Sequence, residues 1–546
     1  MDPRGALYKM YNVADSVSGA EKKTRKTEGT QDLAALIRGL TSGTSQARNA
    51  FLFDNLDLPA MVNFLAARAI TGDTDCCHKN YYLYRDSDGS GEWSAFPWDV
   101  DLSFGRVWTC NTPCLSYFDE TIYTNTALFV GNNNTVFSAV LTHPATRTMY
   151  LRRFRSLMDE LTQPPGTPAD QDRWRRRSTE LRDLIAPDAA LDLARWGTWG
   201  RRETITQAVD RIHREFLPGR RNYLFSTLAR AGTVPATQPT NTTVRFARVE
   251  PRPASGNRFH EFLEITNANA FAVDLSDWRI DGPVRFRFKP GTVLPARSNA
   301  VVSPDRRQFR SRTTGPRGGQ NLLVLGDYSG ELDARGGELT LSDAKGRVVH
   351  STQLPATPSA PQNQLRITEL LANPAGSEDA ADAEFVELRN LGPTTLDLAG
   401  VRFTEGIRFD FSTGAVRTLD PSRYVLVVRD LAAFRLRYGF GLPVAGVYQG
   451  QLDNAGESLR LEDPSGEPIL DFDYSPASQP LADRFGHSLV VADASTPPER
   501  WSSSAAWTAS ASAGGSPGAD EPPALAQPPV VIHEILAHTD PPLLDA

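Results

Sequence analysis

The second half of this chain contains the same pattern twice. HEFLEITNANAFAVDLSDWRI at 260–280 aligns with AEFVELRNLGPTTLDLAGVRF at 383–403, and GELDARGGELTLSDAKG at 330–346 aligns with GQLDNAGESLRLEDPSG at 450–466. The copies lie about 120 residues apart, which is the size of one β-sandwich domain. Both copies alternate short strand-like runs with turns rich in Gly, Pro and Asp. The repeat therefore predicts two consecutive all-β, immunoglobulin-like sandwiches.

A third copy begins close to the end of the sequence. VVIHEILAHTD at 530–540 resembles LRITELLANPA at 365–375, and the sequence stops at Ala546. A first strand alone lacks most of its core, so we expect the chain to be truncated here. The expected boundaries are sandwiches at 244–352 and 364–501, linkers at 233–243, 353–363 and 502–529, and the start of a third domain at 530–546.

Residues 1–232 have a different pattern. Apolar residues recur at helical spacing in four segments, 56–70, 145–162, 170–185 and 203–232, with the last expected to be kinked or broken at Pro218. Between them, NYYLYRDSDGSGEWSAFPWDVDLSFG predicts a β-hairpin that turns at DSDGSG. This region is therefore expected to be an α+β domain that is mostly helical.

Composition excludes some classes of function. The chain has 546 residues, 40% of them hydrophobic and 23% charged, as in ordinary folded proteins of several domains. Its net charge of −7 argues against a general nucleic-acid binder. The sequence contains no apolar run of about 18 residues, so we expect no transmembrane segment in this chain.

All four cysteines lie in the first domain. They are Cys76, Cys77, Cys110 and Cys114, a spacing that departs from the paired C-x-x-C pattern of zinc sites. We expect one or two disulfides between the first two cysteines and the last two, as suits an exported protein. Free buried thiols and a zinc site are the alternatives.

Two aspartates interrupt the apolar run FPWDVDLSFG at 96–105. On a strand, Asp99 and Asp101 share one face, roughly 6–7 Å apart, while Trp98 belongs to the core under the hairpin. Two carboxylates in such a place repel each other and lose solvation. A bound cation would relieve that repulsion.

A second polar motif precedes the hairpin. Asp75 and Asn80 form D-x-x-x-x-N, the spacing of kinase catalytic loops, in which the Asp orients the acceptor hydroxyl and the Asn holds a metal. The hairpin can bring Asn80, Asp99 and Asp101 to one Mg²⁺, which prefers oxygen ligands. The alternative is that Asp75 and Asn80 cap a turn while the other two acids pair with arginines.

Several motifs occur in an order that resembles a known family. ALYKMYN, FDNLDLPAMVNFLAARAITGDTD, KNYYLYRD and FPWDVDLSFG, within residues 5–230, resemble the CotH family of spore-coat-type atypical protein kinases. The resemblance implies transfer of the ATP γ-phosphate to protein hydroxyls, assisted by Mg²⁺ or Mn²⁺. It implies Asp75 as catalytic base, Asn80 and Asp99 as cofactor-binding residues, and Asn80, Asp99 and Asp101 as metal ligands.

The resemblance also implies that a part of the kinase fold is missing. In this family a lobe with the phosphate-binding lysine precedes the LYK motif, which here begins at Leu7. The first four lysines of the chain, Lys9, Lys22, Lys23 and Lys26, come too late to be that lysine. We therefore expect the N-terminal lobe to be absent and this fragment to be inactive, whereas the resemblance implies phosphate transfer by the full-length protein.

The sandwiches resemble the lamin tail domain. ITELLANP, EFVELRN and LRLEDPSG carry this likeness, which implies binding of a protein or cell-surface ligand, or spacing. We interpret Glu264 and Glu387, on the repeated strand, as structural or surface acids. The combination suggests an exported bacterial protein at the cell surface or outside the cell, with its signal peptide lost. The alternative function is a non-catalytic surface or adhesion protein with a degenerate kinase-like domain.

Overall fold

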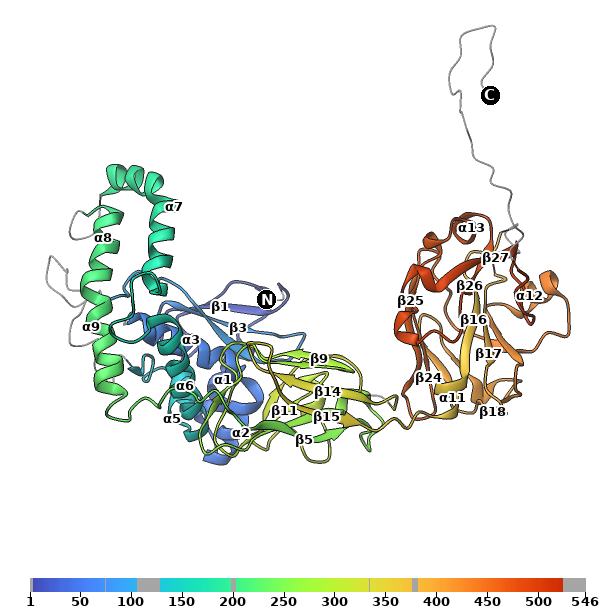
Figure 1. Ribbon diagram of the computed structural model, residues 1–546, viewed down its shortest axis with the longest axis horizontal. Helices are drawn as coiled ribbons and strands as arrows, with labels where there is room; N and C mark the ends of the chain where they lie inside the picture. The colour runs from blue at the N-terminus through green and yellow to red at the C-terminus, as the bar shows by residue number, and fades with distance from the viewer. Residues whose placement is uncertain are drawn as a thin grey trace, which may run out of the picture. The chain divides into compact units, whose positions relative to one another are not determined.

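The computed structural model describes residues 3–73, 75–105, 128–197, 203–332, 334–375 and 382–523 (Figure 1). The chain divides into two compact units. The first comprises Met1–Leu332 and Gly336–Pro355, which include the N-terminal domain and the first sandwich. The second comprises Asp333–Arg335 and Ala356–Ala546 and contains the second sandwich. In the described ranges, no helix has the length and apolarity needed to cross a membrane.

The N-terminal domain contains one antiparallel sheet with the strand order β2-β1-β3-β4. The strands are β1 (Ala6–Met10), β2 (Ala20–Lys22), β3 (Tyr81–Arg85) and β4 (Trp93–Pro97). The predicted hairpin is confirmed, because β3 and β4 pair along their whole length around the turn at 86–91. That turn is held by Asp86, whose Oδ2 accepts a hydrogen bond of 2.7 Å from the Ser90 N–H.

The second hairpin strand is shorter than predicted. β4 ends at Pro97, and one further backbone hydrogen bond of 3.3 Å, from the Trp98 N–H to the Asn80 carbonyl, closes the ladder. Asp99 then adopts a left-handed backbone conformation, with φ of 53°. The prediction that Asp99 and Asp101 share a strand face is therefore wrong, since both lie exposed in the loop after β4. The core position predicted for Trp98 is also wrong, since its side chain is 45% exposed.

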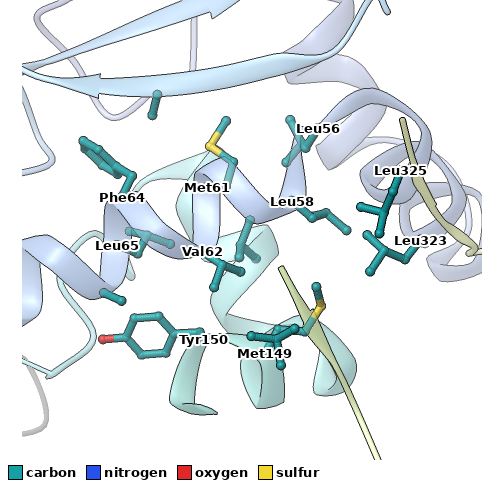
Figure 2. Packing of buried hydrophobic residues seen from close by; sticks show 14 of the residues in the cluster. Leu56, Leu58, Met61, Val62, Phe64, Leu65, Met149, Tyr150, Leu323 and Leu325 are labelled. Carbon is teal, nitrogen blue, oxygen red and sulfur yellow. The ribbon is translucent and has the colours of Figure 1, made fainter. Parts of the chain in front are cut away.

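Helices pack beside this sheet and supply most of the domain's core. α3 is capped by Asp57, whose Oδ1 accepts a hydrogen bond of 3.1 Å from Ala60 N–H, and it stops at Gly72, which has φ of 67°. The buried face of α3 packs on α6 (Figure 2). The helices predicted at 56–70 and 145–162 are thus confirmed. Among the described residues, the helices beside the sheet are α1 (Gln31–Thr41), α2 (Ser45–Asn55), α3 (Leu58–Thr71), α5 (Thr135–Thr142) and α6 (Pro144–Leu157).

Two long helical segments complete the domain. α7 (Arg173–Trp196) contains Pro187 and changes direction along its length (Figure 1). The predicted interruption at Pro218 is replaced by continuous helix, in which π-helical turns stand before and after the proline and accommodate its missing N–H. The successive segments are α8 (Ile205–Arg211), η3 (Ile212–Phe216), α9 (Leu217–Arg221) and η4 (Asn222–Leu228).

The first repeat folds as the predicted β-sandwich. Its sheets have the orders β12-β11-β6-β5 and β13-β9-β8-β14-β15, with a small β10-β7 pair and helix α10 (Arg306–Arg310). The strands are β5 (Val244–Glu250), β6 (Phe262–Asn267), β7 (Val273–Asp274), β8 (Arg279–Asp281), β9 (Val284–Arg287), β10 (Val293–Leu294), β11 (Asn299–Val302), β12 (Leu323–Leu325), β13 (Ser329–Gly330), β14 (Gly337–Ser342) and β15 (Val348–Leu354).

The second repeat has the same architecture. Its sheets have the orders β23-β22-β17-β16-β26-β27 and β20-β19-β24-β25, with a small β18-β21 pair. Its elements are α11 (Ala360–Gln364), β16 (Leu365–Leu371), β17 (Phe385–Asn390), β18 (Leu396–Asp397), β19 (Arg402–Glu405), β20 (Phe409–Asp410), β21 (Thr418–Leu419), β22 (Tyr424–Val428), α12 (Leu431–Tyr438), β23 (Val444–Val447), β24 (Glu457–Glu462), β25 (Pro468–Tyr474), α13 (Pro480–Arg484), β26 (His487–Val491) and β27 (Trp507–Ala513).

Two segments predicted as linkers contain regular structure. The segment 502–529 contributes β27, which pairs with β26 and extends the larger sheet of the second sandwich. The segment 353–363 contains the end of β15 and most of α11. A run rich in Ser and Ala is typical of a linker, but in β27 these small residues form an edge strand of the sheet. The expected third domain at 530–546 lies outside the described residues.

The repeats share a buried acid that explains part of their sequence similarity. Glu261 accepts a hydrogen bond of 2.7 Å from the Tyr328 hydroxyl, and Glu384 accepts one of 2.9 Å from the Tyr448 hydroxyl. In each copy the same carboxylate also accepts a backbone N–H bond from a leucine four residues after the tyrosine. In each repeat this acid therefore joins the start of the strand that it precedes to the segment that carries the tyrosine and the leucine.

Candidate functional site

The predicted site lies where α3 and the β3–β4 hairpin end. The loop from α3 to β3 carries Asp75 and Asn80, and Nδ2 of Asn80 donates a hydrogen bond of 2.7 Å to Oδ2 of Asp75. Asn80 is nearly buried, with φ of 65°, and the Asp75 side chain is 14% exposed. The structure therefore brings the two polar residues of the D-x-x-x-x-N motif into direct contact.

Asp99 and Asp101 complete a cluster of acids beside this pair. The pKa of Asp99 is raised by partial loss of solvation, by the adjacent Asp101 carboxylate and by Asp75, against the lowering effect of Lys79. The three carboxylates are thus close enough to repel each other, although Asp99 and Asp101 face solvent. The like charges of this cluster raise the free energy of its ionised state.

Arg68 supports the site from beneath, and the motif analysis missed it. Its side chain extends from α3 and is only 4% exposed. Nη2 donates hydrogen bonds of 2.5 Å to the Asn80 carbonyl and 3.2 Å to the Trp98 carbonyl. Burial lowers the pKa of Arg68 to about 10, which Asp75 and Asp99 oppose. An arginine within the apolar run LPAMVNFLAARAI was the sequence signal for this role.

Arg68 also has a buried carboxylate as its partner. It forms an ion pair with Asp73, which is 1% exposed. Asp73 Oδ1 in turn accepts a hydrogen bond of 3.2 Å from the Asp75 N–H. One guanidinium therefore joins the loop before β3 to the loop after β4.

A lysine and aromatic rings border the acids. Lys9 on β1 lies over the Trp98 ring at 4.6 Å and over the Tyr11 ring at 4.9 Å. Trp98 makes an edge-to-face contact with Tyr82, with 5.5 Å between ring centroids. Trp98 is exposed because it packs on Tyr82 and Lys9 outside the core. The Lys9 ammonium group and the flat face of Trp98 therefore lie beside Asp99.

The cysteine pattern differs from the prediction. Cys76 and Cys77 form a disulfide with each other, so neither bridges to the later pair as expected. Cys110 and Cys114 lie outside the described residues. The disulfide stands directly after Asp75, in the loop that carries the acid.

The metal set predicted from sequence contains two acids and one amide. Across the parts of the chain that the structure describes, no group of three or more His, Cys, Asp or Glu side chains is arranged to hold a metal ion. Asn80, Asp99 and Asp101 therefore stay a prediction as metal ligands.

Comparisons with known proteins agree with this architecture. The family model of the CotH kinase protein matches residues 4–224, and the model of the Lamin Tail Domain matches 237–355 and 358–476. The chain combines a CotH kinase domain with two lamin tail domains. The order is the one predicted from the motifs, and Asp75, Asn80, Asp99 and Asp101 all lie inside the CotH kinase domain.

The other comparisons add little. No curated protein matches the chain. A solved structure, the crystal structure of the YadV chaperone, is similar at 9% identity with a TM-score of 0.11, covering 43% of this chain and 100% of that one.

Proposed function

We propose that the CotH kinase domain binds a metal–ATP complex at the acid cluster, and that in the full-length protein, with its N-terminal lobe, it transfers the γ-phosphate to protein hydroxyl groups. The observation that carries this proposal is the contact between Asp75 and Asn80 next to Asp99 and Asp101. General-base and metal-ligand chemistry need these residue types within one small site. The family match supports the reaction class.

The donor set suits Mg²⁺ or Mn²⁺. Carboxylate and amide oxygens are the hard ligands that these ions prefer. Asn80 donates its Nδ2 to Asp75, so the amide Oδ1 is left as the acceptor atom for a cation. The repulsion that raises the pKa of Asp99 would be relieved by a positive charge. When bound, such an ion neutralises phosphate charge.

The residues of the chain have separate roles in this proposal. Asp75 accepts the proton of the substrate hydroxyl, and its hydrogen bond with Asn80 fixes the carboxylate orientation. Arg68 fixes both loops through the Asn80 and Trp98 carbonyls. Lys9 supplies a positive charge at the edge of the site and can attract phosphate.

We also propose that the protein is bacterial and acts at the cell surface or outside the cell, where the lamin tail domains bind a protein or cell-surface ligand. The Cys76–Cys77 disulfide supports an oxidising compartment.

A titration of the full chain with Mn²⁺, with and without ATP, followed by electron paramagnetic resonance, tests the proposal. We expect ATP-dependent Mn²⁺ binding, and we expect Asp99→Ala to weaken it about tenfold or more because a ligand is lost. With labelled ATP and a generic acceptor protein, Asp75→Asn should retain this binding but lose any transfer that the wild type shows.

Asp88→Ala is the matched control, because Asp88 is an acid on the same hairpin that pairs with Arg25 at 3.1 Å. It should bind Mn²⁺ like the wild type. Equal binding by the wild type and Asp99→Ala, or none by the wild type, would contradict the proposal and favour the non-catalytic surface or adhesion protein.

A further inference from the structure

The CotH kinase domain and the first lamin tail domain share one hydrophobic core. Leu323 and Leu325 on β12 pack beside Leu56 and Leu58, at the start of α3 (Figure 2). α6 lies against β7 and β10, and α2 lies against β12. The two domains recognised from sequence are therefore joined by apolar side chains in one compact unit.

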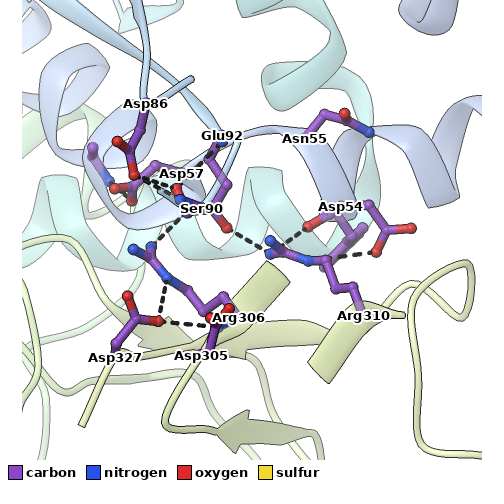
Figure 3. A network of polar contacts seen from close by, with 12 residues as sticks. Asp54, Asn55, Asp57, Asp86, Ser90, Glu92, Asp305, Arg306, Arg310 and Asp327 are labelled. Atoms are coloured by element: carbon purple, nitrogen blue, oxygen red, sulfur yellow. Dashed lines mark hydrogen bonds and ion pairs between the residues drawn. The ribbon is translucent and has the colours of Figure 1, made fainter. Parts of the chain in front are cut away.

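A buried carboxylate with two arginines lies at this interface. Glu92, which directly precedes β4, is 4% exposed. It receives 2.5 Å hydrogen bonds from Nη1 of Arg306 and Nη2 of Arg310, both on α10 (Figure 3). Burial raises the pKa of Glu92 against the opposing effect of the two guanidinium groups. The carboxylate of the hairpin therefore depends on the lamin tail domain for its counter-charges.

The start of α3 is held from the same side. Asp57, the N-cap of α3, forms a 2.9 Å ion pair with Lys289. Just before it, at the end of α2, Asp54 Oδ2 accepts a hydrogen bond of 2.7 Å from the Gly319 N–H. Gly291 comes so close to the helix that a Cβ there would lie 2.2 Å from the Pro59 carbonyl oxygen.

The segment predicted as the linker 233–243 is also attached. Arg152 Nη1 donates to the Ala236 carbonyl at 2.8 Å, and Arg155 Nη2 donates to the Thr237 hydroxyl at 2.7 Å. Both arginines belong to α6. The connection therefore follows the surface of the CotH kinase domain.

We propose that the first lamin tail domain is a positioning element of the CotH kinase site. It holds β4 and α3 at their starts, and the site residues follow the ends of the same two elements. β4 runs from Trp93 to Pro97, two residues before Asp99, and α3 ends four residues before Asp75. Strand and helix are rigid, so anchoring one end restricts the other, about 13 Å away along β4 and about 20 Å away along α3. In its catalytic consequence this inference rests on the proposed function.

The variant Arg306→Met/Arg310→Met in the full chain tests this role. Glu92 would keep a buried charge without its two partners, so the start of β4 should loosen. We expect amide hydrogen exchange in 93–105 and 75–80 to become about tenfold faster. ATP-dependent Mn²⁺ affinity should fall several-fold. The matched control is Arg285→Met/Arg287→Met, which removes two exposed arginines of β9 in the same domain.

The control should leave both measurements unchanged. Faster exchange in β12 and α10 alone, with wild-type exchange at 75–80 and 93–105, would overturn the inference. If the wild type binds no Mn²⁺, the proposed function fails, while the exchange measurement still decides the positioning role. If the double variant does not fold, the same exchange measurement on Glu92→Gln tests the inference, because glutamine keeps the shape of the side chain and removes its charge attraction to the two arginines. Wild-type exchange near the site in Glu92→Gln would then overturn the inference.

Discussion

At the scale of single residues, the site depends on Arg68 as much as on the acids. One buried guanidinium contacts the carbonyls of Asn80 and Trp98 and pairs with Asp73. These contacts join loops from opposite strands of the hairpin. The acids can therefore lie side by side although two of them stand in an exposed loop.

Replacing this arginine should destabilise the first unit. In Arg68→Met the Asp73 carboxylate remains buried without its counter-charge, which costs about 3–5 kcal/mol of unfolding free energy. Chemical denaturation of the full chain, followed by hydrogen exchange of α3, measures this loss. Arg68→Met/Asp73→Asn should recover part of it, because the orphaned charge is removed. A double variant as unstable as the single one would contradict this explanation.

At the scale of elements, the second lamin tail domain holds a loop over its larger sheet with two buried acids. Glu369 on β16 and Glu387 on β17 are cross-strand neighbours. Glu369 accepts a hydrogen bond of 3.0 Å from the Ser516 N–H, and Glu387 accepts one of 2.5 Å from the Gly518 N–H. Glu387, predicted as a structural or surface acid, is thus structural.

The two buried acids that hold this loop should make the second lamin tail domain less stable at alkaline pH. Burial raises the pKa of Glu369 to about 7 and that of Glu387 to about 8, from an ordinary 4.5. Because the folded-state pKa values are raised, their stabilisation is complete below about pH 4.5 and is lost as pH rises through 7 to 8.

Hydrogen exchange of β16, β17 and 514–521 between pH 6 and pH 9, corrected for intrinsic rates, measures this loss. Glu387→Gln should reduce the pH dependence, since an amide of similar shape carries no charge. Glu264→Gln, in the first lamin tail domain, should leave it unchanged. A Glu387→Gln protein with the pH dependence of the wild type would show that the buried acid is not its cause.

At the scale of the whole molecule, the compact units of the structure differ from the domains recognised in the sequence. The CotH kinase domain and the first lamin tail domain belong to one compact unit, and the second lamin tail domain belongs to another. Two domains that share a core lose their packing together, because neither keeps its apolar surface covered alone.

Calorimetry of the full chain should therefore show two transitions rather than three. Gly291→Ala should lower the unfolding free energy of the first unit by about 2 kcal/mol or more. The reason is that Gly291 has φ of 89° and an added Cβ meets the Pro59 carbonyl. Gly346→Ala is the control, since Gly346 also has positive φ but open space around its Cβ position. Three separate transitions, or equal effects of the two variants, would contradict a shared core.

Local patterns in the sequence determined the elements and their order. The repeat of about 120 residues encodes two sandwiches, because each copy carries the alternation and turns of one domain. The hairpin and the helices at 56–70 and 145–162 follow from the same local periodicity. Even the Asp75–Asn80 contact follows from spacing within one short loop.

Only the tertiary structure decided what lies between those elements. The left-handed backbone at Asp99, directly after the end of β4, moves the acid pair from a strand into a loop. β27 completes a sheet from residues that look like a linker. Glu92 and Arg310 meet although 218 residues separate them. Such a contact leaves no local periodic signal, because it forms only when two complete domains bury their surfaces against each other.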